Sequence, residues 1–178
     1  VLGDLKKDVL IPAFDLDNQN PDPDLRTWKP KFFHNLPGKG SDKKEFVVDV
    51  VLRSCAAPVY FPAYQGFIDG GVVANNPSLA AIAQAIQSRK LAPARMRLLS
   101  LGTGHNLEYI SGTRLDWGLA QWSPVLLRLL SASSMGVVDY QCRQLLGQDY
   151  HRLSTIYEQR IPPDAADQTQ KLVDIADA

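Results

Sequence analysis

One acidic residue is notable for its position in the sequence. Asp69 follows an apolar pair and precedes Gly70 and Gly71, in the stretch FIDGGVVANNPSLAAIAQAI that begins at Phe67. A carboxylate held at such a point can accept a proton from a nucleophile. An Asp-Gly pair between apolar residues is also a typical signal for a hairpin turn, in which Asp69 would be only structural.

The residues that follow favour the chemical interpretation. A hairpin would return along a second strand, whereas Asn76 and Pro77 are typical of a helix start, with Asn76 as the N-cap. Apolar residues then recur at helical spacing as far as Ile86. A strand, a sharp Gly-Gly turn and a helix would place Asp69 at the carboxyl end of a strand, where open α/β sheets carry their active sites.

The rest of the chain alternates between apolar strand-like runs and amphipathic helical patterns. Residues 45–57 are ambiguous, but their length and their stop before Pro58 favour a helix. Residues 15–44 are rich in turn-forming types and predict a long loop, either a substrate-facing cover or scaffolding. We expect strands at 9–14, 66–69, 97–101 and 150–158, and helices at 76–90, from 123 onwards, at 134–146 and at 167–178. This order predicts an α/β fold, three-layer α/β/α with a mainly parallel sheet.

Composition excludes some classes of function. Lysine plus arginine equals aspartate plus glutamate at 19 each, so the basic excess of a nucleic-acid binder is missing. Apolar runs fall short of the roughly 18 residues of a membrane span. Cys55 and Cys142 lie in apolar contexts and predict buried thiols, which favours a reducing compartment such as the cytoplasm.

Several sequence motifs for metal binding, nucleotide binding or catalysis are incomplete or absent in these residues. Residues 15–26 resemble the start of a calcium loop but lack its central glycine and final glutamate. His34, His105 and His151 are isolated from one another and from both cysteines, so we expect surface or capping histidines and no metal or cofactor. Gly-Thr-Gly at 102–104 is a weak candidate for a nucleotide-phosphate loop. The nucleophile elbow Gly-x-Ser-x-Gly does not occur in these 178 residues.

A set of short motifs occurs in order and at close spacing. They are SCAAP at 54–58, YFP at 60–62, FIDGG at 67–71, ANNP at 74–77 and LSLGTG at 99–104. Together they resemble the C-terminal half of the catalytic domain of the patatin-like phospholipases. The resemblance covers roughly residues 2–104.

The resemblance implies a lipid acyl hydrolase with a Ser–Asp dyad. Asp69 matches the family's general base, and Gly70 and Gly71 match the active-site turn. The nucleophilic serine and the oxyanion loop would lie upstream of this chain. The substrate would be a phospholipid or another acyl-ester lipid, with peripheral membrane contact and no cofactor, metal or nucleic acid.

The same resemblance predicts that residues 1–178 form the C-terminal part of a single patatin-like domain, apparently lacking its N-terminal portion. The missing half, or another chain, would complete the sheet, so we expect an exposed apolar edge. Because the chain has no nucleophile elbow, we expect it to be inactive toward esters by itself.

Two alternatives stay open. Ser54 is a poor nucleophile candidate because it lacks an elbow, and its small neighbours fit close packing better. A non-catalytic patatin-like module that binds lipid or protein is the rival from another class. In either case we expect Asn75 and Asn76 to cap the helix that follows the turn.

Overall fold

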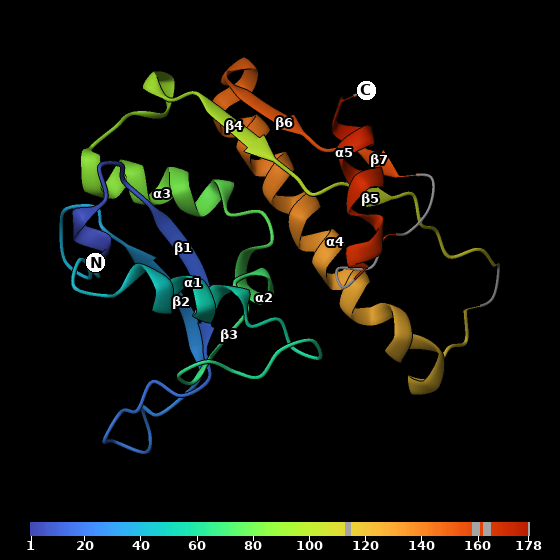
Figure 1. Cartoon of the computed structure of the whole chain (residues 1–178), viewed down its shortest axis with the longest axis horizontal. Helices are drawn as coiled ribbons and strands as arrows, with labels where there is room; N and C mark the ends of the chain where they lie inside the picture. The colour runs from blue at the N-terminus through green and yellow to red at the C-terminus, as the bar shows by residue number, and fades with distance from the viewer. Residues whose placement is uncertain (113–114, 158–160, 162–164, 178) are drawn as a thin grey trace.

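The computed structural model describes residues 1–112, 115–157, 161 and 165–177. Figure 1 shows two groups of elements, the first built by the N-terminal half of the chain and the second by the C-terminal half. Helix α3 (Ser78–Arg89) of the first group packs against helix α4 (Leu119–Leu146) of the second.

The first group is built on a three-stranded antiparallel sheet of order β2-β1-β3. Its strands are β1 (Leu10–Asp15), β2 (Lys29–His34) and β3 (Phe67–Ile68). Helices α1 (Val47–Cys55) and α2 (Gly71–Ala74) both pack against β1. The core of this group consists of Leu2, Ala13, Phe33 and Val50.

The long loop predicted at 15–44 is wrong in one part, because it contains β2. Pro30 and the lysines on either side of it gave this segment the composition of a loop. Strand β2 lies at the edge of the sheet, where proline is tolerated, and Pro30 pairs in register with Phe14 of β1. Its inner end carries Phe33, which is 2% exposed and supplies core packing.

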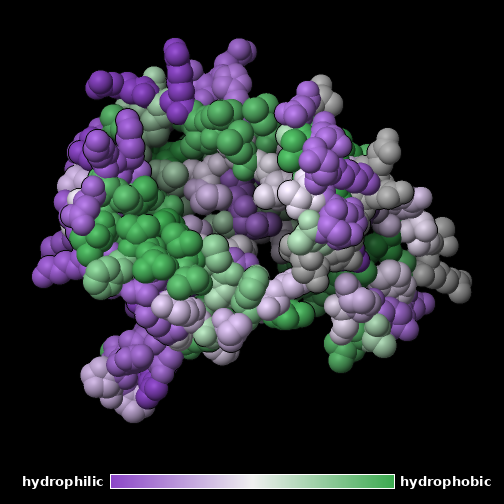
Figure 2. Space-filling model, in the orientation of Figure 1, coloured by the Kyte–Doolittle hydropathy of each residue, from purple (hydrophilic) through white to green (hydrophobic). Residues whose placement is uncertain are grey.

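Helix α1 confirms the helical interpretation of residues 45–57. Val50 is fully buried, while Val48, Val51 and Leu52 are exposed on the outer side of the helix. Figure 2 shows hydrophobic surface over this part of the molecule. Cys55, at the end of the helix, is exposed, so the prediction of two buried thiols holds only for Cys142.

The second group contains two parallel strand pairs. Strand β4 (Leu98–Leu101) pairs with β6 (Tyr150–Leu153), and β5 (His105–Asn106) pairs with β7 (Ile156–Tyr157). The strand expected at 150–158 is therefore two short strands, and Glu158 lies outside the described residues. The α/β class is confirmed, with two small parallel sheets beside the antiparallel one.

The two helices expected from 123 onwards and at 134–146 are one continuous helix of 28 residues, α4. It begins at Leu119, before Pro124, and the serine and alanine residues at 131–134 continue it because neither type breaks a helix. Its buried residues, Cys142 and Leu146, join Ile82 and Tyr150 in a second core cluster.

The C-terminal helix α5 (Thr169–Asp177) follows a short 3-10 turn at Ala166–Gln168, close to the helix expected at 167–178, whose last residue lies outside the described part. Further 3-10 turns lie at Leu2–Asp4, Pro93–Arg95 and Gly147–Asp149. Among the described residues, no helix is both long and apolar enough to cross a membrane.

One face of the β4–β6 pair is apolar and open. Leu99 and Leu101 of β4 and Leu153 of β6 are 61%, 72% and 60% exposed. Parallel sheets are normally covered on both faces. Three leucine side chains are therefore exposed on this sheet face, while the exposed apolar edge expected from the sequence stays a prediction.

The closest backbone approach in the first group is at Gly70, and it gives a stability prediction. A Cβ at this position would lie 2.3 Å from the carbonyl oxygen of Pro12 and 2.8 Å from Oγ of Ser54. We expect Gly70→Ala to lower the free energy of unfolding by about 1–3 kcal/mol, as overpacking of a close-packed site does. Urea denaturation measures the change.

Gly136→Ala is the matched control, because Gly136 lies inside α4 and a Cβ there would meet nothing within 4 Å. This variant should gain about 0.5–1 kcal/mol, since glycine disfavours a helix interior. Wild-type stability of Gly70→Ala would show that the contact with Pro12 does not constrain the turn.

Candidate functional site

Asp69 directly follows a strand, as the sequence predicted, and precedes a short helix, α2, that was not predicted. Strand β3 ends at Ile68, and α2 begins at Gly71. The backbone N–H of Asp69 donates to the carbonyl of Ala56 at 3.1 Å, and that of Gly70 donates to the carbonyl of Ser54 at 3.0 Å. The turn is therefore fixed to the end of α1 by two backbone hydrogen bonds.

The Asp69 carboxylate is half-buried and is oriented by its own turn. Its Oδ1 accepts a hydrogen bond from the Gly71 N–H at 2.9 Å. A Cβ on Gly71 would lie 3.2 Å from Oδ2 of Asp69 and 3.4 Å from Oδ1 of Asn75. Asp69 and Asn75 thus lie on the same side of Gly71, and the missing side chain of Gly71 leaves room for both.

Ser54 is close to this turn but is not placed as a nucleophile. It belongs to helix α1, its carbonyl accepts the Gly70 N–H, and its Oγ packs against the Cα of Gly70. It does not sit at a strand-to-helix elbow, which agrees with the packing role expected from its small neighbours.

Asn76 is buried and organises the start of α3. Its Oδ1 accepts the Ser78 N–H at 3.2 Å, although the residue directly before the helix is Pro77. The predicted helix is therefore confirmed, but the prediction of Asn76 as its N-cap is wrong by one residue, because Pro77 occupies that position. Its Nδ2 is buried and has no hydrogen-bond partner among the described residues.

A buried polar chain connects Asn76 to the second group. The hydroxyl of Ser78 donates to Oγ of Ser100 at 3.1 Å, and Nη1 of Arg152 donates to the same oxygen at 2.7 Å. These contacts join α3, β4 and β6.

The Gly-Thr-Gly segment does not form a nucleotide-phosphate loop. After Gly104 the chain enters β5, whereas such a loop requires a helix whose N-terminus faces the phosphate. A Cβ on Gly104 would lie 2.3 Å from the ring of Tyr157, whose hydroxyl donates to the carbonyl of Thr103. The glycine is needed for this close packing.

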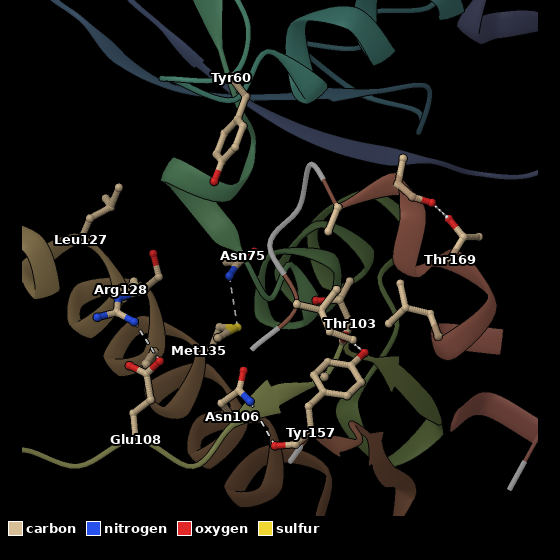
Figure 3. Close-up of a pocket in the computed structure, with 17 residues that line it drawn as sticks. Tyr60, Asn75, Thr103, Asn106, Glu108, Leu127, Arg128, Met135, Tyr157 and Thr169 are labelled. Carbon is tan, nitrogen blue, oxygen red and sulfur yellow. Dashed lines mark hydrogen bonds and ion pairs between the residues drawn. The ribbon is translucent and has the colours of Figure 1, made fainter. Parts of the chain in front are cut away.

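A hollow of about 710 Å³, the inner hollow, lies between the two groups of elements (Figure 3). Tyr60 and Asn75 border it from the first group, and side chains from α4, α5 and the segment 103–108 border it from the second. In Figure 3 the amide of Asn75 points toward Met135, to whose sulfur it donates at 3.2 Å. Asp69 is not among the residues that line the inner hollow. Asn75, which lies beside Asp69 at Gly71, does line it.

The histidines and cysteines do not form a metal site. Among the described residues no group of three or more His, Cys, Asp or Glu side chains could hold a metal ion. His105 and His151 are exposed, but His34, expected at the surface or as a cap, is only 6% exposed because β2 carries it into the sheet. Burial raises the pKa of the Cys142 thiol, so it is an unreactive core residue.

A match to a family model gives the class of protein. Residues 3–82 match the model of the patatin family, described as patatin-like phospholipase. Residues 3–82, which include Asp69, Gly70 and Gly71, are thus a patatin-like phospholipase segment.

Individual relatives extend the similarity beyond residue 82. The chain is 40% identical over 118 residues to CotR of Bacillus subtilis, an alignment with 66% of this chain and 35% of that protein. It is 38% identical to protein teg of Priestia megaterium over 70% of this chain and 38% of the relative. It is 34% identical to a cGAMP-activated phospholipase of Pseudomonas aeruginosa over 85% of this chain and 45% of the relative. The chain thus spans less than half the length of these relatives.

The carboxylate of Asp139 on α4 gives a prediction on how stability depends on pH. Burial acts to raise the pKa of Asp139, but hydrogen bonds from Arg143 and Tyr150 outweigh it and hold the pKa below its usual 3.8. A lowered folded-state pKa contributes stability above the unfolded-state value, and this contribution is lost as the pH falls through the folded-state value.

We therefore expect Asp139→Asn to lower the free energy of unfolding by about 1 kcal/mol at neutral pH. The difference from wild type should shrink as the pH falls below 3.8. Urea denaturation across this pH range measures it. Asp149→Asn is the control, because Asp149 pairs at 3.3 Å with an Arg97 side chain that is 90% exposed and should change stability little. A pH-independent loss in Asp139→Asn would contradict the electrostatic explanation.

Proposed function

We propose that this chain is the part of a lipid acyl hydrolase that carries the general base, and that Asp69 is this base. The observation that supports it best is the position of Asp69 in a rigid Asp-Gly-Gly turn, within the residues that match the patatin-like phospholipase model. The nucleophilic serine would come from a segment of the full-length protein that precedes residue 1. Residues 1–178 would then be the C-terminal part of one patatin-like domain.

The contacts of Asp69 suit this role. One carboxylate oxygen, Oδ1, accepts the Gly71 N–H, which fixes the direction of the side chain. Among the described residues Oδ2 accepts no hydrogen bond, so a serine hydroxyl could donate to it. A base must lie within hydrogen-bond reach of the proton it removes, and a fixed carboxylate lowers the cost of reaching that geometry.

The reaction would proceed in two steps. Asp69 accepts the serine proton as the hydroxyl oxygen attacks the ester carbonyl, and the alcohol part of the lipid leaves with a proton. Water, deprotonated by the same carboxylate, then cleaves the acyl-serine ester and releases a carboxylic acid. The substrate would be a phospholipid or another acyl-ester lipid, reached by peripheral contact with a membrane.

Exchange of the base tests this proposal in the full-length protein. We expect Asp69→Asn to reduce kcat for ester hydrolysis by about 10²–10⁴, because asparagine keeps the hydrogen bond to Gly71 but cannot take a proton. Turnover of a fluorogenic acyl ester and of phospholipid vesicles measures the loss. Unchanged turnover would exclude Asp69 as the base.

Asp22→Asn is a matched control, because Oδ1 of Asp22 accepts the N–H of the residue two positions later, at 3.0 Å, as Asp69 does. Asp22 lies in the exposed loop after β1, so its exchange should leave turnover unchanged.

A second candidate is a non-catalytic patatin-like module that binds lipid or protein. It is favoured by the lack of Gly-x-Ser-x-Gly in these residues and by the placement of Ser54 inside a helix. A serine-directed fluorophosphonate probe separates the two candidates. We expect it to label the full-length protein and to leave the isolated 178-residue chain unlabelled. Failure to label the full-length protein would favour the binding module.

A further inference from the structure

A second hollow, which we call the apolar groove, lies next to the inner hollow and shares part of its lining. The groove has a volume of about 800 Å³, within the usual range of ligand pockets. Its apolar lining consists of Leu107, Tyr109, Ile110, Val125 and Leu129. Glu108, Arg128 and Ala132 line both hollows and form the wall between them.

The apolar groove is open to solvent. Leu107 is 74% exposed, Tyr109 88% and Leu129 42%. Exposed apolar side chains that gather around a hollow, rather than occurring singly, mark a ligand or interaction site. A hydrocarbon chain would remove them from water, and no polar partner is needed along most of the lining.

The wall of the groove carries a cation that already holds a carboxylate. Nη1 of Arg128 on α4 donates to Oε1 of Glu108 at 2.8 Å, and in Figure 3 the two side chains point toward each other. Among the described residues that line either hollow, Arg128 is the only lysine or arginine. Its positive charge thus lies in the wall of a groove whose lining is mostly apolar.

The Arg128–Glu108 pair is weak enough to exchange. The two side chains are 40% and 51% exposed, and pairs at such exposure contribute about 0–1 kcal/mol. A ligand carboxylate could therefore replace Glu108 on the guanidinium at little cost, with Glu108 turning to solvent.

We propose that the apolar groove and Arg128 bind a long-chain carboxylate. The hydrocarbon chain lies against Leu107, Ile110 and Leu129, and the carboxylate takes the position of the Glu108 carboxylate on Arg128. A second carboxylate matches the donor geometry that Arg128 already satisfies, and the apolar lining matches the chain. The identity of the acid rests on the proposed function, since ester hydrolysis would release such a compound, but binding is measured without hydrolysis.

The test measures binding of oleate to the 178-residue chain. Binding is detected as the displacement of a bound fluorescent fatty acid by oleate. We expect Arg128→Gln to weaken oleate binding about two- to fivefold, the effect of losing one half-exposed ion pair. Glu108→Gln should strengthen it about two- to fivefold, because the internal competitor is removed. Equal affinity in Arg128→Gln and wild type would overturn the proposal.

Arg89→Gln is the matched control. Arg89 pairs with Asp8 at 2.7 Å, and its 48% and 40% exposed side chains resemble those of Arg128 and Glu108. Arg89 lines neither hollow, so its exchange should leave oleate binding unchanged. Leu129→Gln tests the groove separately from the charge and should also weaken binding, with circular dichroism used to verify that each variant is folded.

Two further ligands fix the chemistry of the site. A long-chain alcohol of the same length should bind about two- to fivefold more weakly than oleate, because it cannot form an ion pair with Arg128. A monoacyl phosphate ester that bound tenfold more tightly than oleate would overturn the assignment to a carboxylate. No binding of oleate to wild type would overturn the site itself. None of these results depends on Asp69, so failure here and failure of the hydrolase proposal are separable.

Discussion

The close approach at Gly70 is the constraint on which the first group of elements depends. Three segments meet there: the Asp-Gly-Gly turn, the end of α1 and the middle of β1, where Pro12 contributes its carbonyl. Gly70 has ordinary helical backbone angles, with φ −62° and ψ −26°, so it is required by space and not by backbone conformation. The backbone N–H groups of Asp69 and Gly70 donate hydrogen bonds to carbonyls at the end of α1. A side chain at position 70 would therefore push the helix and the turn apart, and the Asp69 carboxylate would move with the turn.

The two groups of elements are joined by helix packing and by buried polar contacts. Helices α3 and α4 pack through the cluster that contains Ile82 and Cys142. Beside it, Ser100 receives hydrogen bonds from Ser78 and from Arg152, so one hydroxyl on β4 connects the start of α3 with β6. Arg152 is half-buried, and its hydrogen bond to Ser100 satisfies part of its donor capacity. This arrangement fixes Asn75 and Asn76, which precede α3, relative to the segment 102–104.

The sequence predicted the local structure around Asp69 well, because each signal there is local. Gly70 and Gly71 leave room for the close approach of the turn to its neighbours, and Asn76 with Pro77 precedes a helix, so the strand-turn-helix order follows from adjacent residues. Strand β2 was missed because its stability comes from pairing with β1 and from burial of Phe33, which its lysines and Pro30 conceal. Helix α4 was divided in two because the serine and alanine residues at 131–134 interrupt the apolar pattern, yet neither residue type breaks a helix. The inner hollow could not be predicted at all, since segments far apart in the sequence form it.

Carboxylates in this chain differ in the groups that hold them, and the difference bears on what each can do. Hydrogen bonds from Arg89 and Arg26 lower the pKa of Asp8 and Asp17, which makes these side chains weaker proton acceptors. Glu108 is held by Arg128 in the same manner, in a position that a carboxylate from outside could take. Asp69 differs from all three, because the partner of its carboxylate is a backbone N–H and it forms no ion pair among the described residues. The turn thus orients this carboxylate without a cation, in the part of the chain that matches the family model, and this orientation supports the proposal that Asp69 removes a proton from a serine.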